Sequence, residues 1–145
     1  MPRRLVALIA AGVLALPAMA GDYTLGNLTI SNPWSRATAP GMSMGVAYFS
    51  ITNRGKVADA LVAASSPAAA RVEIHQTSIS DGMARMRPLQ EVVISPGATV
   101  KVESGGIHLM LVDLKQPLTP TATVPLTLRF REAGEITVQL SVESP

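Results

Sequence analysis

Turn-forming residues interrupt this chain at short, regular intervals, and no long amphipathic helix fits between them. Turn signals stand at Asn53-Arg54-Gly55, Ser80-Asp81-Gly82, Ser95-Pro96-Gly97 and Ser104-Gly105-Gly106. The β-branched and aliphatic runs between such signals are spaced by about 8 to 12 residues, as in sandwiches and barrels. The sequence therefore predicts an all-β domain, with strands at 23–30, 45–53, 58–64, 71–76, 83–86, 90–94, 99–103, 107–111, 126–131 and 135–142.

Length and composition narrow the possibilities further. A chain of 145 residues, 48% of them hydrophobic, is of the size of one domain and can bury a core of its own. It contains no cysteine. That excludes a disulfide framework, thiolate zinc sites, a redox CxxC motif, a cysteine nucleophile and a copper electron-transfer site that needs a thiolate.

The first twenty residues have the three parts of a secretory signal peptide. Arg3 and Arg4 form a basic region, residues 5–16 are apolar, and Ala18-Met19-Ala20 is a small-x-small cleavage site. The apolar run is shorter than the roughly 20 residues that span a bilayer, so a retained anchor is the less favoured alternative. We expect a signal peptide at 1–20, export to the periplasm, and a mature domain at 21–145 with no membrane span.

The predicted mature domain is formally neutral. Of the 12 Lys and Arg residues, Arg3 and Arg4 belong to the leader, which leaves 10 against 10 Asp and Glu. Binding to nucleic acid or to an anionic membrane surface requires clustered basic residues on the folded domain. Neither partner is expected.

Strand alternation places a histidine beside a methionine near residue 110. A period of two puts Ile107, Leu109 and Leu111 on one face, which is the expected core face, and His108 with Met110 on the other.

The same rule applies to the strand expected at 71–76. It puts Val72 and Ile74 inside, and Glu73 and His75 on the outer face. The chain has two histidines, so both are predicted to face away from the core. Imidazole and thioether groups both bind soft Cu(I), whereas zinc, magnesium and calcium sites favour thiolates or carboxylates. A soft-metal site is therefore the favoured interpretation of these strands.

The spacing of these residues resembles that of a known family. Ten residues separate His75 from Met86, and twenty-one separate Met86 from His108. One residue then separates His108 from Met110. This pattern is similar to that of the periplasmic copper chaperone family written PCu(A)C or PCuAC, although Gln76 stands where some members have methionine. Further similar segments are Pro33-Trp34-Ser35-Arg36, Asn53-Arg54-Gly55, Val72-Glu73-Ile74-His75 and Gly106-Ile107-His108-Leu109-Met110-Leu111.

The resemblance implies a single cupredoxin-like Greek-key β-barrel or sandwich that presents one accessible Cu(I). The implied ligands are His75, Met86, His108 and Met110. It also implies a carrier, not an enzyme, that delivers copper in the periplasm, and we expect this carrier to be a monomer. The implied acceptor is the binuclear copper site of cytochrome c oxidase subunit II, or a second copper chaperone.

Other interpretations of single residues stay open. Met83 could compete with Met86 or simply pack, and Met42 and Met44 could approach the metal or belong to ordinary loop packing. Glu73 could orient an imidazole or face solvent. Arg85 and Arg87, which alternate with Met86, are either a solvated face or a docking site for an acidic partner.

Two alternative functions differ from copper carriage. A secreted interaction module, in which the histidines and methionines are incidental, would retain no metal. A copper enzyme would show turnover, but no acid-base pair around an open pocket is recognisable in the sequence.

Overall fold

The computed structural model describes residues 21–144, so the predicted signal peptide lies outside the described residues. Within 21–144 the secondary structure is strand, and no helix in that range is long and apolar enough to cross a membrane. The predicted all-β fold is confirmed. The strands are β1 (Tyr23–Leu25), β2 (Leu28–Arg36), β3 (Met44–Asn53), β4 (Asp59–Ser65), β5 (Ala69–Ser80), β6 (Met83–Pro88), β7 (Val92–Ile94), β8 (Thr99–Val102), β9 (Ile107–Leu114), β10 (Thr123–Phe130) and β11 (Gly134–Glu143).

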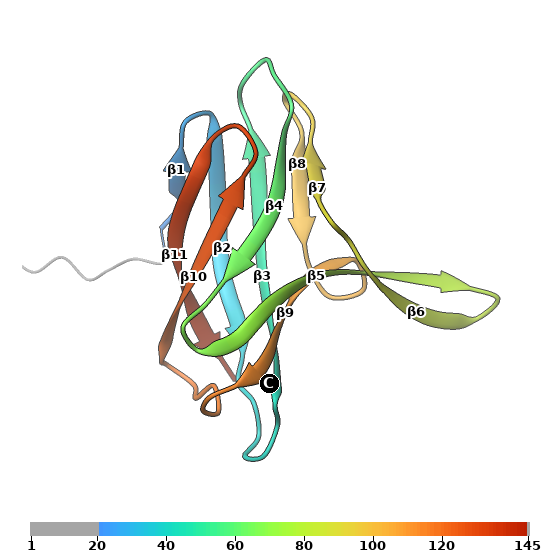
Figure 1. Cartoon of the computed structure of the whole chain (residues 1–145), viewed down its shortest axis with the longest axis vertical. Coiled ribbons are helices and arrows are strands. Elements are labelled where there is room, and N and C mark those ends of the chain that lie inside the picture. The colour runs from blue at the N-terminus through green and yellow to red at the C-terminus, as the bar shows by residue number, and fades with distance from the viewer. Residues whose placement is uncertain (1–20, 145) are drawn as a thin grey trace, which may run out of the picture.

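The strands form one strongly curved sheet that wraps around a core (Figure 1). Their order is β6-β5-β9-β8-β3-β2-β11-β10-β4-β7, with β1 added beside β2 and a further pairing of β9 with β3. The β2–β11 and β8–β9 pairs are parallel, and the other pairs are antiparallel. Several neighbours in this order, such as β5 with β9 and β2 with β11, are far apart in the sequence, so the chain does not follow a simple meander.

The core lies inside this curved sheet, and most strands contribute inward-facing side chains at alternate positions. Leu109 and Leu111 of β9 are fully buried there, as the alternation of that strand predicts. Leu126, Leu128 and Leu140 come from the opposite side of the fold. The core thus fixes β9 by one face, and His108 and Met110 lie on the other face of the strand.

The N-terminal part of the sheet differs from the prediction. One strand was expected at 23–30, but β1 and β2 are separate antiparallel strands joined at Gly26, whose φ of 56° lies in the left-handed region that glycine adopts easily. The second strand continues through Pro33 to Arg36, with a register shift between Ser31 and Trp34. Asn32 has a positive φ of 51° at this irregularity, a conformation that asparagine tolerates better than most residues.

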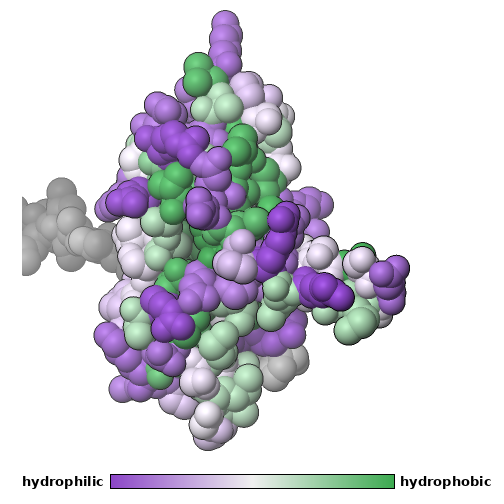
Figure 2. Space-filling view, turned by 45° about the vertical axis from the view of Figure 1, so that its right-hand side comes forward, coloured by the Kyte–Doolittle hydropathy of each residue, from purple (hydrophilic) through white to green (hydrophobic). Residues whose placement is uncertain are grey.

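The β5–β6 hairpin projects from the body of the molecule (Figures 1 and 2). A two-residue turn joins its strands, because Ser80 pairs with Met83. The turn residues Asp81 and Gly82 have φ of 52° and 75°, which fits the type I′ turn expected for an Asp-Gly hairpin. Every residue of β6 is exposed.

Candidate metal centre

Three neighbouring strands bring the four predicted metal ligands to one face of the sheet. In the antiparallel pairing of β5 with β9, His75 is directly opposite His108, and Glu73 is opposite Met110. In the pairing of β5 with β6, Met86 is opposite Thr77. Directly opposed residues share a face, as do residues two apart on one strand. Met86, His75, His108 and Met110 therefore all lie on the face opposite Leu109 and Leu111.

The two imidazole rings are close enough to share one ion. Their centres are 6.0 Å apart and their planes are inclined by 45°. An ion bonded to one nitrogen of each ring at about 2 Å sets the ring centres about 5 to 6 Å apart. The pair results from sheet register alone, because 32 residues lie between His75 and His108 in the sequence.

Hydrogen bonds leave one nitrogen of each ring free for a metal. The carbonyl oxygen of Gly106 lies 3.0 Å from Nδ1 of His108 and can only accept, so Nδ1 carries the proton and Nε2 keeps its lone pair. On the other ring, Nε2 of His75 lies 2.8 Å from Oε2 of Glu73 and donates to it. Nδ1 of His75 is then the unprotonated nitrogen, and among residues 21–144 it is buried with no hydrogen-bond partner. A buried nitrogen lone pair without a partner is what a metal ligand requires before the metal arrives.

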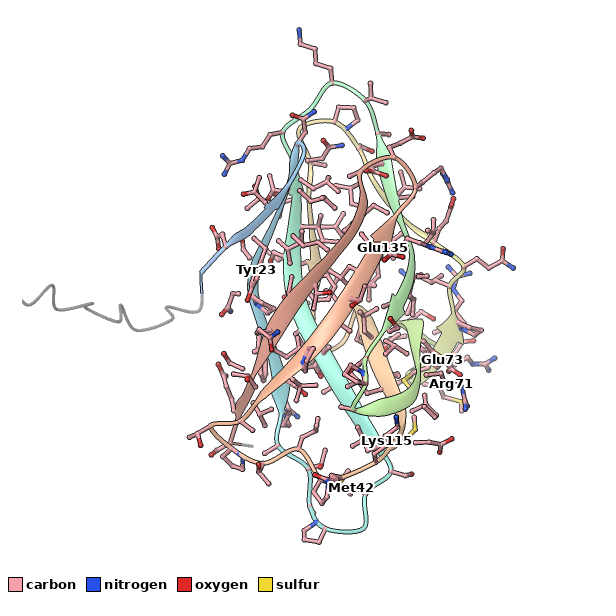
Figure 3. The ribbon with its side chains drawn as sticks, turned by 60° about the vertical axis from the view of Figure 1, so that its left-hand side comes forward. Tyr23, Met42, Arg71, Glu73, Lys115 and Glu135 are labelled. Carbon is pink, nitrogen blue, oxygen red and sulfur yellow. The ribbon has the colours of Figure 1, made fainter. Side chains whose placement is uncertain are left out.

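Glu73 is held as a carboxylate by its neighbours. The hydrogen bond from Nε of Arg71 to Oε1, 2.7 Å long, and then the bond from His75 keep the pKa of Glu73 below its ordinary value. The same contact with Glu73 raises the pKa of Arg71. Figure 3 shows Arg71 and Glu73 next to each other on β5. Of the two interpretations of Glu73, orientation of an imidazole is the one that the contacts support.

Burial differs sharply among the four residues. His108 is 6% exposed and Met110 is 9% exposed, although the sequence predicts that both lie on a polar outer face. Met86, on the projecting hairpin, is 59% exposed. The site therefore has a buried side on β9 and an open side on β6.

Strand β3 accounts for the burial of the β9 residues. Val46 is directly opposite Met110, and Tyr48 follows on the same face of β3, where its ring centre lies 4.8 Å from that of Trp34. The strand pattern in the sequence does not assign Val46 and Tyr48 to the site. The usable signal was that both faces of the strand are apolar, since Val46 and Tyr48 alternate with core residues such as Phe49.

The register also separates Met83 from the site. Met83 pairs with Ser80, and Arg85 with Ser78, so these side chains lie on the opposite face of the hairpin from Met86. Arg87 is on that face too, where it donates a hydrogen bond of 3.0 Å to Gln76. Competition between Met83 and Met86 for one ion is therefore disfavoured.

The methionines of the preceding segment lie apart from the histidines. Met44 begins β3 and pairs with Val112, two residues beyond Met110 along the sheet. Met42 precedes it in the β2–β3 loop, at the end of the molecule seen at the bottom of Figure 3. Within residues 21–144, no group of three or more His, Cys, Asp or Glu side chains could hold a metal ion.

Comparison with known proteins places the chain in a family. Residues 28–142 match the family model described as LpqE-like, putative lipoprotein LpqE-like. The chain belongs to the LpqE-like family. A curated relative, the putative lipoprotein Lxx21020 of Leifsonia xyli subsp. xyli (strain CTCB07), is 30% identical over 115 residues, which are 79% of this chain and 68% of that protein.

Solved structures similar to this LpqE-like protein include a PCuAC domain and a copper-loaded protein. The copper-bound PCuAC domain from PmoF2 is 27% identical, with a TM-score of 0.73, over 86% of this chain and 98% of that domain. The Cu(I) form of DR1885 from Deinococcus radiodurans is 28% identical, with a TM-score of 0.65, over 92% of this chain and 83% of that protein. The predicted cupredoxin-like fold of the PCuAC type is confirmed.

We expect Glu73→Gln to weaken metal binding at this site. Loss of the carboxylate removes the partner that fixes the tautomer of His75, and such outer partners typically contribute about 10- to 100-fold to metal affinity. The measurement is a competition titration against a chromogenic Cu(I) chelator.

Asp113→Asn is the matched control for Glu73→Gln. Oδ2 of Asp113 lies 3.4 Å from Nη1 of Arg71, so its change also removes one negative charge beside Arg71. Asp113 has no contact with His75 among the hydrogen bonds of the described residues. Equal losses in both variants would show a general charge effect and would contradict an orienting role for Glu73.

Proposed function

We propose that this protein is a copper carrier that holds one Cu(I) through His75, Met86, His108 and Met110 and passes it to an acceptor protein. The observation that carries the proposal is the cross-strand histidine pair, in which Nδ1 of His75 is buried and has no hydrogen-bond partner among the described residues. Its fold is similar to that of a copper-bound PCuAC domain and of Cu(I)-loaded DR1885, which supports copper as the metal.

The donor set favours Cu(I) over harder ions. Two neutral imidazoles and two neutral thioethers leave the site with the single charge of the ion, and thioethers bind Cu(I) in preference to zinc, magnesium or calcium. No thiolate tunes the site for electron transfer, because the sequence contains no cysteine. Carriage of the ion, in place of redox turnover, is the function that these ligands serve best.

The place of action follows from the predicted leader and the family. A signal peptide at residues 1–20 would export the protein, and family members are described as putative lipoproteins. We propose that the carrier works in the periplasm as a monomer. Its resemblance to PCu(A)C proteins suggests as acceptor the binuclear copper site of cytochrome c oxidase subunit II, or a second copper chaperone.

Copper stoichiometry tests the function directly. Purified copper-free protein is reconstituted with Cu(I) without oxygen, passed through a desalting column and analysed for copper and protein. We expect one copper per chain, released to an acceptor without any catalytic turnover. Absence of retained copper would contradict the proposal and would favour the alternative of a secreted interaction module.

The hairpin provides a matched pair of methionine variants. Met86 and Met83 are 59% and 60% exposed, lie three residues apart, and occupy opposite faces of the same hairpin. We expect Met86→Leu to weaken Cu(I) binding about 10-fold, because leucine keeps the volume and loses the sulfur ligand. Met83→Leu should leave the affinity unchanged in the same chelator competition. A larger loss of affinity in Met83→Leu than in Met86→Leu would contradict this assignment and would make Met83 the sulfur ligand.

A further inference from the structure

Strand β6 is the outer edge of the sheet and has an open side. Among residues 21–144 it pairs with β5 alone. An edge strand that presents unpaired N–H and C=O groups can accept an additional strand from another chain. The open side of β6 is next to the candidate metal centre, because Met86 is part of this strand.

The register shows which backbone groups of β6 point outward. Ser80 and Met83 close a two-residue hairpin and so form a hydrogen-bonded pair, after which hydrogen-bonded and non-hydrogen-bonded pairs alternate. Met86 and its partner Thr77 are therefore a non-hydrogen-bonded pair. Two observed bonds agree with this phase: the N–H of Thr77 donates to Gly106 on the β9 side, and the N–H of Leu89 donates to Ile74.

The outward groups belong to Ala84, Met86 and Pro88, which occupy the non-hydrogen-bonded positions. Proline has no N–H, so the free edge offers both a donor and an acceptor at Ala84 and Met86. A strand added here would form its backbone hydrogen bonds with Met86 itself. Its residue directly opposite Met86 would share the face of His75 and His108, about 5.5 Å from Met86 between Cα atoms.

Charge on the other face of β6 indicates what kind of strand fits. Arg85 and Arg87 flank Met86, are both exposed, and form no ion pair with an acidic residue among the described residues. Residues of an added strand on either side of the one opposite Met86 would face these arginines. Acidic side chains there would form cross-strand pairs, whereas a second β6 edge would set arginine against arginine.

From these observations we infer that β6 is the acceptor-docking edge: an extended acidic segment of the copper-accepting protein adds to it as a strand. This inference rests on the proposed function. The docked segment carries a soft ligand, a thioether or an imidazole, opposite Met86 and acidic residues opposite Arg85 and Arg87. The incoming ligand replaces the sulfur of Met86, so copper stays Cu(I) and no electron is transferred.

A short peptide tests the edge without copper. The probe is a capped Thr-Thr-Glu-Met-Glu-Thr-Thr peptide with a fluorescent label, titrated with the full protein by anisotropy and mapped by amide chemical shifts. We expect the largest shifts at Ala84 and Met86. A peptide with lysine in place of glutamate should bind about 5- to 10-fold more weakly, since both cross-strand charge pairs become repulsive.

Two sets of variants test strand addition. Ala84→Pro removes one outward N–H and should weaken peptide binding about 5-fold, while Ala84→Val keeps the N–H and should not. Reversal of both arginines, Arg85→Glu with Arg87→Glu, should exchange the preference, so that the lysine peptide binds better than the glutamate peptide. Equal binding of the glutamate peptide to the Ala84→Pro and Ala84→Val proteins, or no exchange after charge reversal, would overturn the inference.

Copper measurements on the same samples separate this inference from the proposed function. Ala84→Pro should still retain one Cu(I) per chain, because Ala84 is not a proposed ligand. Peptide binding without copper retention would support the docking edge and would refute the carrier function. Copper retention with self-association of the protein through β6, detected by sedimentation, would refute the acidic partner and leave the carrier function standing.

Discussion

Replacement of His108 by alanine is expected to abolish stoichiometric Cu(I) binding while the fold is retained. The change removes a buried imidazole that faces His75 across β9 and β5, and the loss of such a ligand should lower affinity by more than about 100-fold. The same anaerobic chelator competition measures it. Met110→Leu, which removes the buried sulfur at nearly constant volume, should also lower the affinity.

The stability of His108→Ala is the control for this result. The carbonyl of Gly106 accepts from Nδ1 of His108, but it also accepts the N–H of Thr77 at 3.0 Å, so it keeps one partner in the variant. The lost hydrogen bond should therefore cost roughly 1 kcal/mol, and the space that the buried imidazole leaves adds to that cost. Unfolding of the variant at ordinary temperature would mean that copper loss reports on the fold, and retained affinity would remove His108 from the site.

Replacement of Leu111 by alanine is expected to lower the stability of the fold and to leave the proposed Cu(I) site intact. Leu111 is fully buried on the core face of the same strand, and a leucine-to-alanine change at such a position costs about 2 to 5 kcal/mol in free energy of unfolding. Urea unfolding measures this loss of stability. The slope of the unfolding free energy against urea concentration should be the same as in the wild type. The half-exposed Val93 provides the comparison, since Val93→Ala should cost less than about 1 kcal/mol.

Added copper should affect the thermal stability of the two variants differently. A ligand that binds the native state alone raises the apparent stability. Excess Cu(I) should therefore raise the melting temperature of the wild type and of Leu111→Ala, and leave that of His108→Ala unchanged. A copper-induced rise in the His108→Ala protein would place the metal elsewhere on the molecule.

Strand alternation was sufficient to predict how β9 divides its side chains. Leu109 and Leu111 enter the core, and His108 and Met110 face the other way, because side chains alternate with a period of two along a regular strand. The same rule gave the face of His75. These were local predictions, and they depended on residues that are neighbours in the sequence.

What the sequence could not supply was the pairing of distant strands. Nothing in the alternation of β5 or β9 says that His75 lies opposite His108 and not one pair further along, because register is set by the whole sheet. The burial of Met110 depends on Val46 of β3, which is likewise distant in the chain. The break between β1 and β2 was missed, although Gly26-Asn27 is a two-residue turn signal between them.

The unequal exposure of the two sulfurs makes their chemical durability unequal. Oxidation of methionine to its sulfoxide converts an apolar ligand into a polar group, and it requires access of the oxidant to the sulfur. Met86, on the open hairpin, is accessible to a dissolved oxidant, whereas Met110 is buried beside Val46 of β3. Oxidative stress would thus disable the proposed ligand Met86 first and leave the two histidines and Met110 intact. A methionine sulfoxide reductase can reverse this lesion.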